Sequence, residues 1–318
     1  MEIALFASIL TITVRAGTSL MYATIGEIIT ERSGILNLGV EGMMIMGAVT
    51  AFAAAFHTGS AWLGVATAMV VGGLLALIHA FLTITLRADQ TVSGLALTIF
   101  GTGLASFLGQ RLGPDGMPLV GQVGPRFHKV ALPVLAEIPG IGPALFHQDV
   151  LVYMMYLLVP LAWYILYKTR PGLHLRAIGE SPHTADAMGV NVIGLRYLYT
   201  VFGGMLVGLG GAHLSLSYTP GWTENLTSGR GWIAIALVIF ATWDPARAVV
   251  GALLFGGVNA IQFRLQAAGA TIPAAFLNML PYVLTITVLV IITWWEAFRK
   301  RVGAPAALGI PYMREERA

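Results

Sequence analysis

Long apolar stretches alternate with short polar links along almost the whole chain. A helix needs about 20 mostly apolar residues to cross the hydrocarbon core of a membrane. Eight stretches have this character, and they occupy residues 3–25, 40–57, 61–86, 91–112, 150–168, 197–219, 245–266 and 272–295. The pattern predicts an all-α polytopic membrane protein in which residues 1–318 form a single transmembrane domain.

A ninth apolar stretch, residues 231–243, is short and begins beside Gly229, so it either crosses the membrane or dips into it. If it crosses, twelve basic residues share one side: Arg32, Arg87, Lys168, Arg170, Arg176, Arg196, Arg247, Arg299, Lys300, Arg301, Arg314 and Arg317. Only five lie opposite: Arg111, Arg126, Lys129, Arg230 and Arg264. The positive-inside rule then places the C-terminus in the cytoplasm and the N-terminus outside. We therefore expect about nine transmembrane helices, within a range of eight to ten.

Two links are too long to be simple connections. Residues 113–149 are rich in glycine and proline, show no helical period and fall outside, which is typical of an exposed external loop. Residues 169–196 fall inside. Within them Ser181 and Pro182 supply an N-cap and a proline at the first helical position, and Gly189 supplies a C-terminal stop. We expect a short helix near 182–188.

This helix is too short to be stable alone in water, so it needs a surface to dock on. One interpretation is a capped helix that packs on its own membrane domain. The other is docking in a groove on a soluble partner, which the charged and polar residues of the loop favour: Arg176, Glu180, His183 and Asp186.

The link "ERSGILNLGVEGMMIMGAV", residues 31–49, joins the first two spans on the same inner side. Ser33, Gly34 and Gly39 allow a tight non-helical connection before a helix that starts near Val40. A similar element, "RADQTVSGLALT", begins at Arg87. Both are expected to be polar segments at the mouth of a pore.

Simpler explanations exist for these residues. Glycines at helical spacing, such as Gly94, Gly101 and Gly103, are usually sites of close helix packing in membranes. Charged residues near span ends are often interfacial anchors. Arg15 lies within a span, where a charge either faces protein or water or extends to the interface.

Composition agrees with this reading and excludes several functions. The chain is 57% hydrophobic and 10% charged, with a mean hydropathy of +0.78. Its basic residues are too dispersed for a nucleic-acid surface. The absence of cysteine excludes disulfides, thiol catalysis and thiolate metal sites. No P-loop, paired histidine motif or G-x-S-x-G is present, so we expect no catalytic residues, metal or cofactor. The acidic residues fall at span edges or in loops, which weakens the case for an ion-driven carrier.

Four segments together resemble the permease subunits of ABC importers of the branched-chain amino acid, simple sugar and nucleoside branch. They are "ERSGILNLGVEGMMIMGA", "DQTVSGLALTIFGTGL", "LRAIGESPHTADAMGVNV" and "GRGWIAIALVIFATWDPARAVVGALLFGG", in this order along nearly the whole chain. The first is most similar to the nucleoside permeases whose binding proteins are basic-membrane-protein lipoproteins. The N-terminal part is one span shorter than in the ten-helix members of the branch.

The resemblance implies a type II ABC importer permease in a bacterial-type plasma membrane, with nucleosides as solute and sugars or branched-chain amino acids as near alternatives. Its partners would be ABC ATPase subunits, a solute-binding lipoprotein and a second permease, either a different chain or a second copy. An ion-coupled secondary transporter is the alternative from another class. The resemblance implies ATPase coupling by Arg176, Gly179, Glu180, Ser181, Asp186 and Gly189. It implies a gate edge at Arg32, Ser33, Asn37, Gly39 and Glu41, and we add Asp89 and Gln90 from the neighbouring element.

Overall fold

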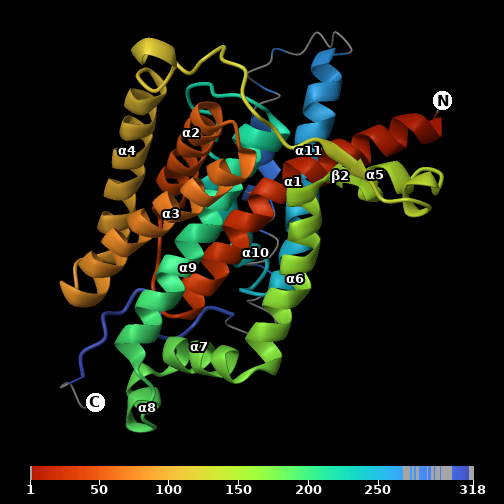
Figure 1. Cartoon of the computed structure of the whole chain (residues 1–318). Coiled ribbons are helices and arrows are strands. Elements are labelled where there is room, and N and C mark those ends of the chain that lie inside the picture. The colour runs from red at the N-terminus through yellow and green to blue at the C-terminus, as the bar shows by residue number, and fades with distance from the viewer. Residues whose placement is uncertain are drawn as a thin grey trace.

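The computed structural model describes residues 2–267 and 303–314, and between them residues 273, 276, 279–284, 286–287, 290 and 294 (Figure 1). The long helices are α1 (Glu2–Arg32), α2 (Val40–Thr58), α3 (Ala61–Ala80), α4 (Gln90–Gly109), α6 (Val150–Lys168), α9 (Val192–His213) and α11 (Pro245–Ala267). The short ones are α5 (Gly142–Phe146), α7 (Arg170–Glu180), α8 (Pro182–Ala187) and α10 (Arg230–Phe240). Short π-helical segments, Phe81–Thr85 and Leu214–Tyr218, extend α3 and α9.

Six helices in the described part are long and apolar enough to cross a membrane: α2, α3, α4, α6, α9 and α11. Each falls on a stretch that the sequence predicts, and α6 has the predicted bounds. Helix α9 begins five residues before the predicted residue 197 because Asn191 caps it, accepting a hydrogen bond from Gly194 N. The predicted span at 272–295 lies mostly outside the described residues.

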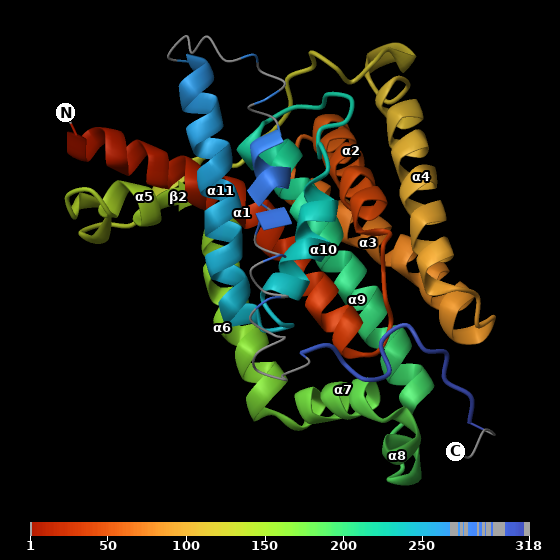
Figure 2. The same ribbon diagram turned by 180° about the vertical axis from the view of Figure 1, so that it is seen from behind.

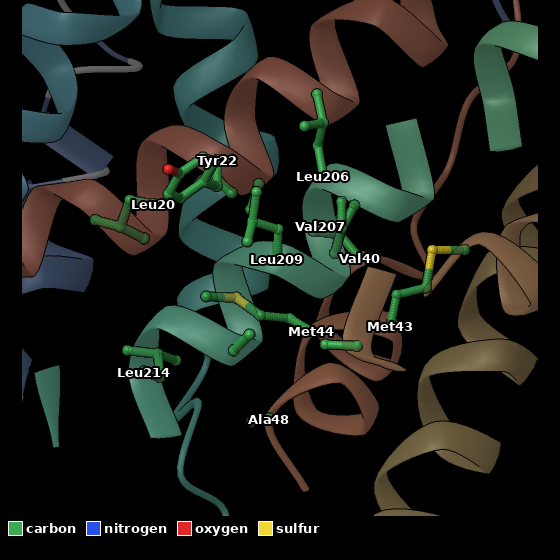
Figure 3. Close-up of a cluster of buried hydrophobic side chains, with 14 of the residues drawn as sticks. Leu20, Tyr22, Val40, Met43, Met44, Ala48, Leu206, Val207, Leu209 and Leu214 are labelled. Carbon is green, nitrogen blue, oxygen red and sulfur yellow. The ribbon is translucent and has the colours of Figure 1, made fainter. Parts of the chain in front are cut away.

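Helix α2 lies at the centre of the bundle and is buried along most of its length. Figure 3 shows Tyr22 of α1, Met44 of α2 and Leu209 of α9 meeting in one cluster of buried side chains. Glycines let these helices approach closely, because a Cβ at Gly47 of α2 would lie 2.5 Å from the Gly208 carbonyl oxygen of α9. The packing interpretation also holds for Gly101, whose Cβ would lie 2.6 Å from Gly42 O, but not for Gly103, which has open space.

Helix α10 is a half-length element between α9 and α11 (Figure 2). Its 11 residues span about 16 Å, roughly half of the hydrocarbon core. The preceding residues 219–229 are not helical, so the chain returns from the end of α9 into the bundle before α10 starts. A discontinuous helix of this kind is tolerated in a membrane only where protein or a cavity surrounds the free backbone.

The two long loops are more ordered than the sequence predicts. Within 113–149, strand β1 (Lys129–Ala131) pairs antiparallel with β2 (His147–Asp149), with Val130 opposite Gln148. The loop also holds 3₁₀ turns at Pro114–Gly116 and Leu135–Glu137. Within 169–196, α7 precedes the expected short helix, and both lie at the end of the bundle opposite these strands (Figure 1). Arg15 faces protein, because its Nη2 donates to Ser217 O at 2.7 Å.

Candidate functional site

The link between α1 and α2, residues 33–39, climbs into the bundle alongside α4. Leu36 N donates to Gln90 Oε1 at the start of α4 (2.7 Å), and Leu38 O accepts from Thr98 Oγ1 (2.8 Å). Gly42 then lies against Gly101. Gly101 comes eleven positions after Gln90 along α4, which corresponds to a rise of about 16 Å. The link is therefore not a turn at the membrane edge, and α2 starts deep inside the protein.

Side chains satisfy the free backbone of this link. His79 Nε2 donates to Leu36 O at 3.1 Å, and Arg196 Nε donates to Ser33 O at 3.1 Å. Asn37 receives most support, since Glu27 Oε1 accepts from its backbone N–H and Glu27 Oε2 from its side-chain amide. Asn37 Oδ1 in turn accepts from Gly39 N at 2.9 Å. Asn37 and Ser33 are fully buried, so the link is a fixed, internally bonded segment in this conformation.

Glu41 connects the starts of α2 and α10. Its Oε1 accepts from the Thr227 hydroxyl and from Gly229 N (3.0 Å), and its Oε2 accepts from Gly231 N (2.6 Å). Free N–H groups and the positive end of the helix dipole both favour a carboxylate at this position. Glu41 is therefore the N-terminal cap of α10, supplied from another helix, and it fixes where the half-length helix begins.

The C-terminal ends of α1 and α10 are also joined. Glu31 accepts a hydrogen bond from the indole N–H of Trp243, and Arg32 Nε donates to Trp243 O at 3.3 Å. Of the second predicted gate element, Gln90 is buried against the link, whereas Asp89 is exposed and caps α4 by accepting from Val92 N at 2.8 Å.

The short helix predicted near 182–188 is present as α8. Its C-terminal stop has the predicted geometry, whereas its N-cap residue does not make the predicted hydrogen bond. Gly189 has the left-handed φ of +83° that the predicted stop requires. Ser181 occupies the N-cap position, but its hydroxyl bonds to Thr184 Oγ1 (2.7 Å) and makes no cap hydrogen bond to the backbone. Arg176 of α7 does not extend toward solvent, because its guanidinium stacks over the Tyr167 ring of α6 at 5.5 Å.

The residues predicted for coupling and those predicted for the gate touch at Gly179. A Cβ on this residue would overlap the Arg32 carbonyl oxygen at the end of α1 and would lie 3.3 Å from Pro305 Cβ. Only glycine allows α7 to pass this close to α1. Because the two backbones are in contact, a movement of α7 along its axis would displace the end of α1 and the link that follows it.

Residues 303–314, here called the C-terminal tail, lie across both regions. Ala307 N donates to Gly179 O (2.8 Å), Ala306 N donates to Glu180 Oε2 (3.3 Å), and Arg314 pairs with Asp186 (3.2 Å). Glu180 and Asp186, which the sequence assigns to a partner, are thus both engaged by the tail.

Tyr312 anchors the tail in a small apolar cluster with Ile178, Ala185 and Val192. Burial and the nearby Asp186 carboxylate raise the pKa of Tyr312, so its phenol stays neutral at physiological pH. The tail also reaches the α1–α2 link, since Gly309 N donates to Gly34 O (3.2 Å) and Arg196 Nη1 donates to Ile310 O (3.4 Å). The tail therefore bridges α7, α8 and the link.

Sequence reasoning did not identify Glu27, Arg196, Trp243 or the tail as parts of this site. A signal existed for Glu27 and Arg196, because ionisable residues at span ends that face the bundle usually pair inside it. A sequence signal for α7 also existed, because Thr169 is an N-cap residue and Pro171 follows at the second helical position, a pattern similar to that of Ser181 and Pro182. In the described part of the chain no group of three or more His, Asp or Glu side chains could hold a metal ion. The arrangement connects the helices and the tail through hydrogen bonds and close packing.

Comparisons with known proteins agree with this geometry. A family model described as "Branched-chain amino acid transport system / permease component" matches residues 8–292. The guanosine ABC transporter permease NupQ of Bacillus subtilis is 36% identical over 309 residues, which cover 94% of each chain. The nucleoside ABC transporter permease NupC of Lactococcus lactis is also 36% identical over 94% of each chain. TsgC13 of Haloferax volcanii, an ABC transporter permease named for glucose, is 41% identical over 97% of this chain and 98% of its own.

A solved structure of a metal-chelate type ABC transporter in an inward-facing conformation has a similar fold, with a TM-score of 0.50 and 17% identity. The similarity covers 90% of this chain and 85% of that one. At 17% identity this similarity is evidence for the fold alone. The fold is that of an ABC transporter permease.

Proposed function

The chain belongs to the family of permease components of branched-chain amino acid transport systems, and from this premise we propose that it imports nucleosides. It is a multi-pass membrane subunit of an ABC importer and not an enzyme. The observation that carries the proposal is 36% identity over 94% of the chain to both a guanosine permease and a nucleoside permease. The glucose name of TsgC13 makes a sugar the second candidate.

In this proposal the protein lies in the plasma membrane with nine crossings and the C-terminus in the cytoplasm. Two contacts support this topology. The tail packs on α7 and α8, which puts the C-terminus at the same end as the predicted cytoplasmic loop. Helix α10 ends beside the inner end of α1, so residues 219–243 lead from one end of the bundle to the other.

ABC ATPase subunits supply the energy, because the sequence has no P-loop of its own. We assign their docking to the exposed face of α8, where His183, Thr184 and Met188 are open to solvent and Met188 is 80% exposed. Movement of α8 would pass through α7 and the tail to the α1–α2 link. We assign the cytoplasmic gate to this link. A second permease and a solute-binding lipoprotein complete the importer.

The solute is tested by competition. The permease is reconstituted with its ATPase subunits and binding lipoprotein, and uptake of radiolabelled guanosine is measured with excess unlabelled guanosine, glucose or leucine. We expect guanosine alone to compete. Labelled glucose entering in preference to guanosine would contradict the nucleoside assignment, and labelled leucine entering would favour the branched-chain amino acid alternative.

A further inference from the structure

A polar cavity of about 580 Å³ lies at the start of α10. Its volume is within the range of about 300–1,000 Å³ that is usual for small-molecule sites. Seven of its described lining residues have polar side chains, and they come from the loop before α10, the first residue of α10, α11 and residue 282: Asn225, Ser228, Arg230, Asn259, Gln262, Gln266 and Tyr282. In a chain that is 57% hydrophobic, such a concentration of polar side chains beside membrane-spanning helices calls for an explanation.

The α11 wall of the cavity is a stripe of amides. Asn259, Gln262 and Gln266 stand at positions i, i+3 and i+7, so they share one face of an otherwise apolar helix. Ile261, on a different face, is 48% exposed. Packing between helices does not require three amides in a row. A column of paired donors and acceptors suits a solute that carries several hydroxyl or amide groups.

The opposite wall is held rigidly in place. Glu41 fixes Gly229 and Gly231 from below, and Tyr282 Oη donates to Ser228 O at 3.0 Å. Arg230 stacks over the Tyr218 ring at 5.1 Å, and its Nη1 is buried without a hydrogen-bond partner among the described residues. In secondary transporters, a discontinuous helix that starts beside a polar cavity commonly helps to hold the substrate. Here Asn225, Ser228 and Gln266 are exposed, so the cavity is open to the surroundings of the bundle.

We propose that this cavity is where the permease holds its solute in transit, and that the solute is a neutral molecule rich in hydroxyl and amide groups, such as a nucleoside. The proposal rests on the proposed function and narrows its solute class. A branched-chain amino acid would need a carboxylate for its ammonium group and an apolar wall for its side chain. Among the described lining residues there is no carboxylate, and only Ile233 and Pro281 are apolar.

The cysteine-free chain offers a direct test. Asn259→Cys and the control Ile261→Cys are each assembled with the ATPase subunits and binding lipoprotein in proteoliposomes. A charged methanethiosulfonate reagent is supplied on both faces, and the rate of thiol modification is measured with guanosine, glucose or leucine. We expect guanosine to slow modification at residue 259 about tenfold when its concentration is ten times its Kd, with no effect at residue 261.

The outcomes separate the solute class from the position of the transit site. Protection by glucose without guanosine supports the solute class and contradicts the nucleoside assignment. Protection by leucine contradicts the class. If residue 259 is unreactive, or reacts equally with and without solute while the parent complex transports guanosine, the cavity is not the transit site although the proposed function stands.

A second variant makes the test independent of thiol chemistry. Gln266→Leu removes one amide from the stripe, and we expect it to raise the KM for guanosine by up to about tenfold, the effect of one lost hydrogen bond. The amount of ATPase that co-purifies should match the parent. Ile261→Leu is the control with parental KM, and a parental KM for Gln266→Leu would overturn the proposal.

Discussion

The carbonyl oxygen of Arg32, at the end of α1, lies directly against Gly179 of α7, with no room for a side chain between them. This contact joins the two regions that the sequence assigns to separate tasks, the coupling loop and the gate. Because α7 also holds the C-terminal tail through Gly179 O, one residue connects α1, α7 and the tail.

Gly179→Ala should disturb this junction. The added methyl group overlaps the Arg32 carbonyl, and relief of such overpacking costs about 1–3 kcal/mol. We expect lower thermal stability and a loss of solute-stimulated ATP hydrolysis, measured on the assembled complex. Gly103→Ala is the matched control, because a Cβ there meets open space and alanine favours a helix. Equal behaviour of the two variants would contradict a special role for Gly179.

Glu41→Gln should loosen the start of α10. The carboxylate accepts from Gly229 N, Gly231 N and Thr227, whereas an amide would turn a donor toward one of these donors. We expect a destabilisation of about 1–3 kcal/mol, read as a lower midpoint of thermal unfolding in detergent. Glu137→Gln, at an exposed position of the long 113–149 loop, should change stability by less than about 0.5 kcal/mol. An unchanged midpoint of thermal unfolding for Glu41→Gln would show that α10 does not need this cap.

The C-terminal tail can be released by Tyr312→Ala. Loss of the buried ring from the cluster with Ile178 and Val192 should weaken tail docking by about 3 kcal/mol. We expect membrane insertion to persist and solute-stimulated ATP hydrolysis to fall. Tyr312→Phe keeps the buried ring in this cluster, so it should retain most of the coupling that Tyr312→Ala loses. Solute-stimulated ATP hydrolysis at the parental rate in Tyr312→Ala would mean that tail docking plays no part in coupling.

Topology is tested with single cysteines in the cysteine-free chain. Met188→Cys, directly after α8 and 80% exposed in the parent, should be labelled by an impermeant thiol reagent only when the cytoplasmic face is accessible, as the twelve-to-five distribution of basic residues predicts. Val123→Cys, in the loop that is predicted to be external and 91% exposed in the parent, should be labelled from outside. The reverse pattern would overturn both the orientation and the assignment of α8 to an ATPase.

Six of the predicted spans coincide with helices of the described residues that are long and apolar enough to cross a membrane, because the signal for a span is local. Helix α6 has the expected bounds, since an unbroken apolar run follows Asp149, which caps the helix by accepting from Leu151 N and Val152 N. Gly189 was recognisable as a stop for the same reason: the left-handed conformation depends on one residue. The family followed from four segments in order.

The depth of the α1–α2 link was not predictable from its own residues. Its partners are Gln90, Arg196 and Gly309, which are far away in sequence and nearby only after folding. The tail shows the same limit. Its residues, GAPAALGIPYMR, show no helical period, and their role depends on the position of Asp186 and on the Ile178 and Val192 side chains that pack against Tyr312.

The most direct measurement of the central claim is guanosine uptake by proteoliposomes that contain the permease, its ATPase subunits and its binding lipoprotein. Accumulation should require ATP and should persist when ionophores collapse sodium and proton gradients. The permease alone should neither accumulate guanosine nor hydrolyse ATP. Uptake by the permease alone, or uptake that ionophores abolish while ATP remains, would contradict the account and identify an ion-coupled carrier instead.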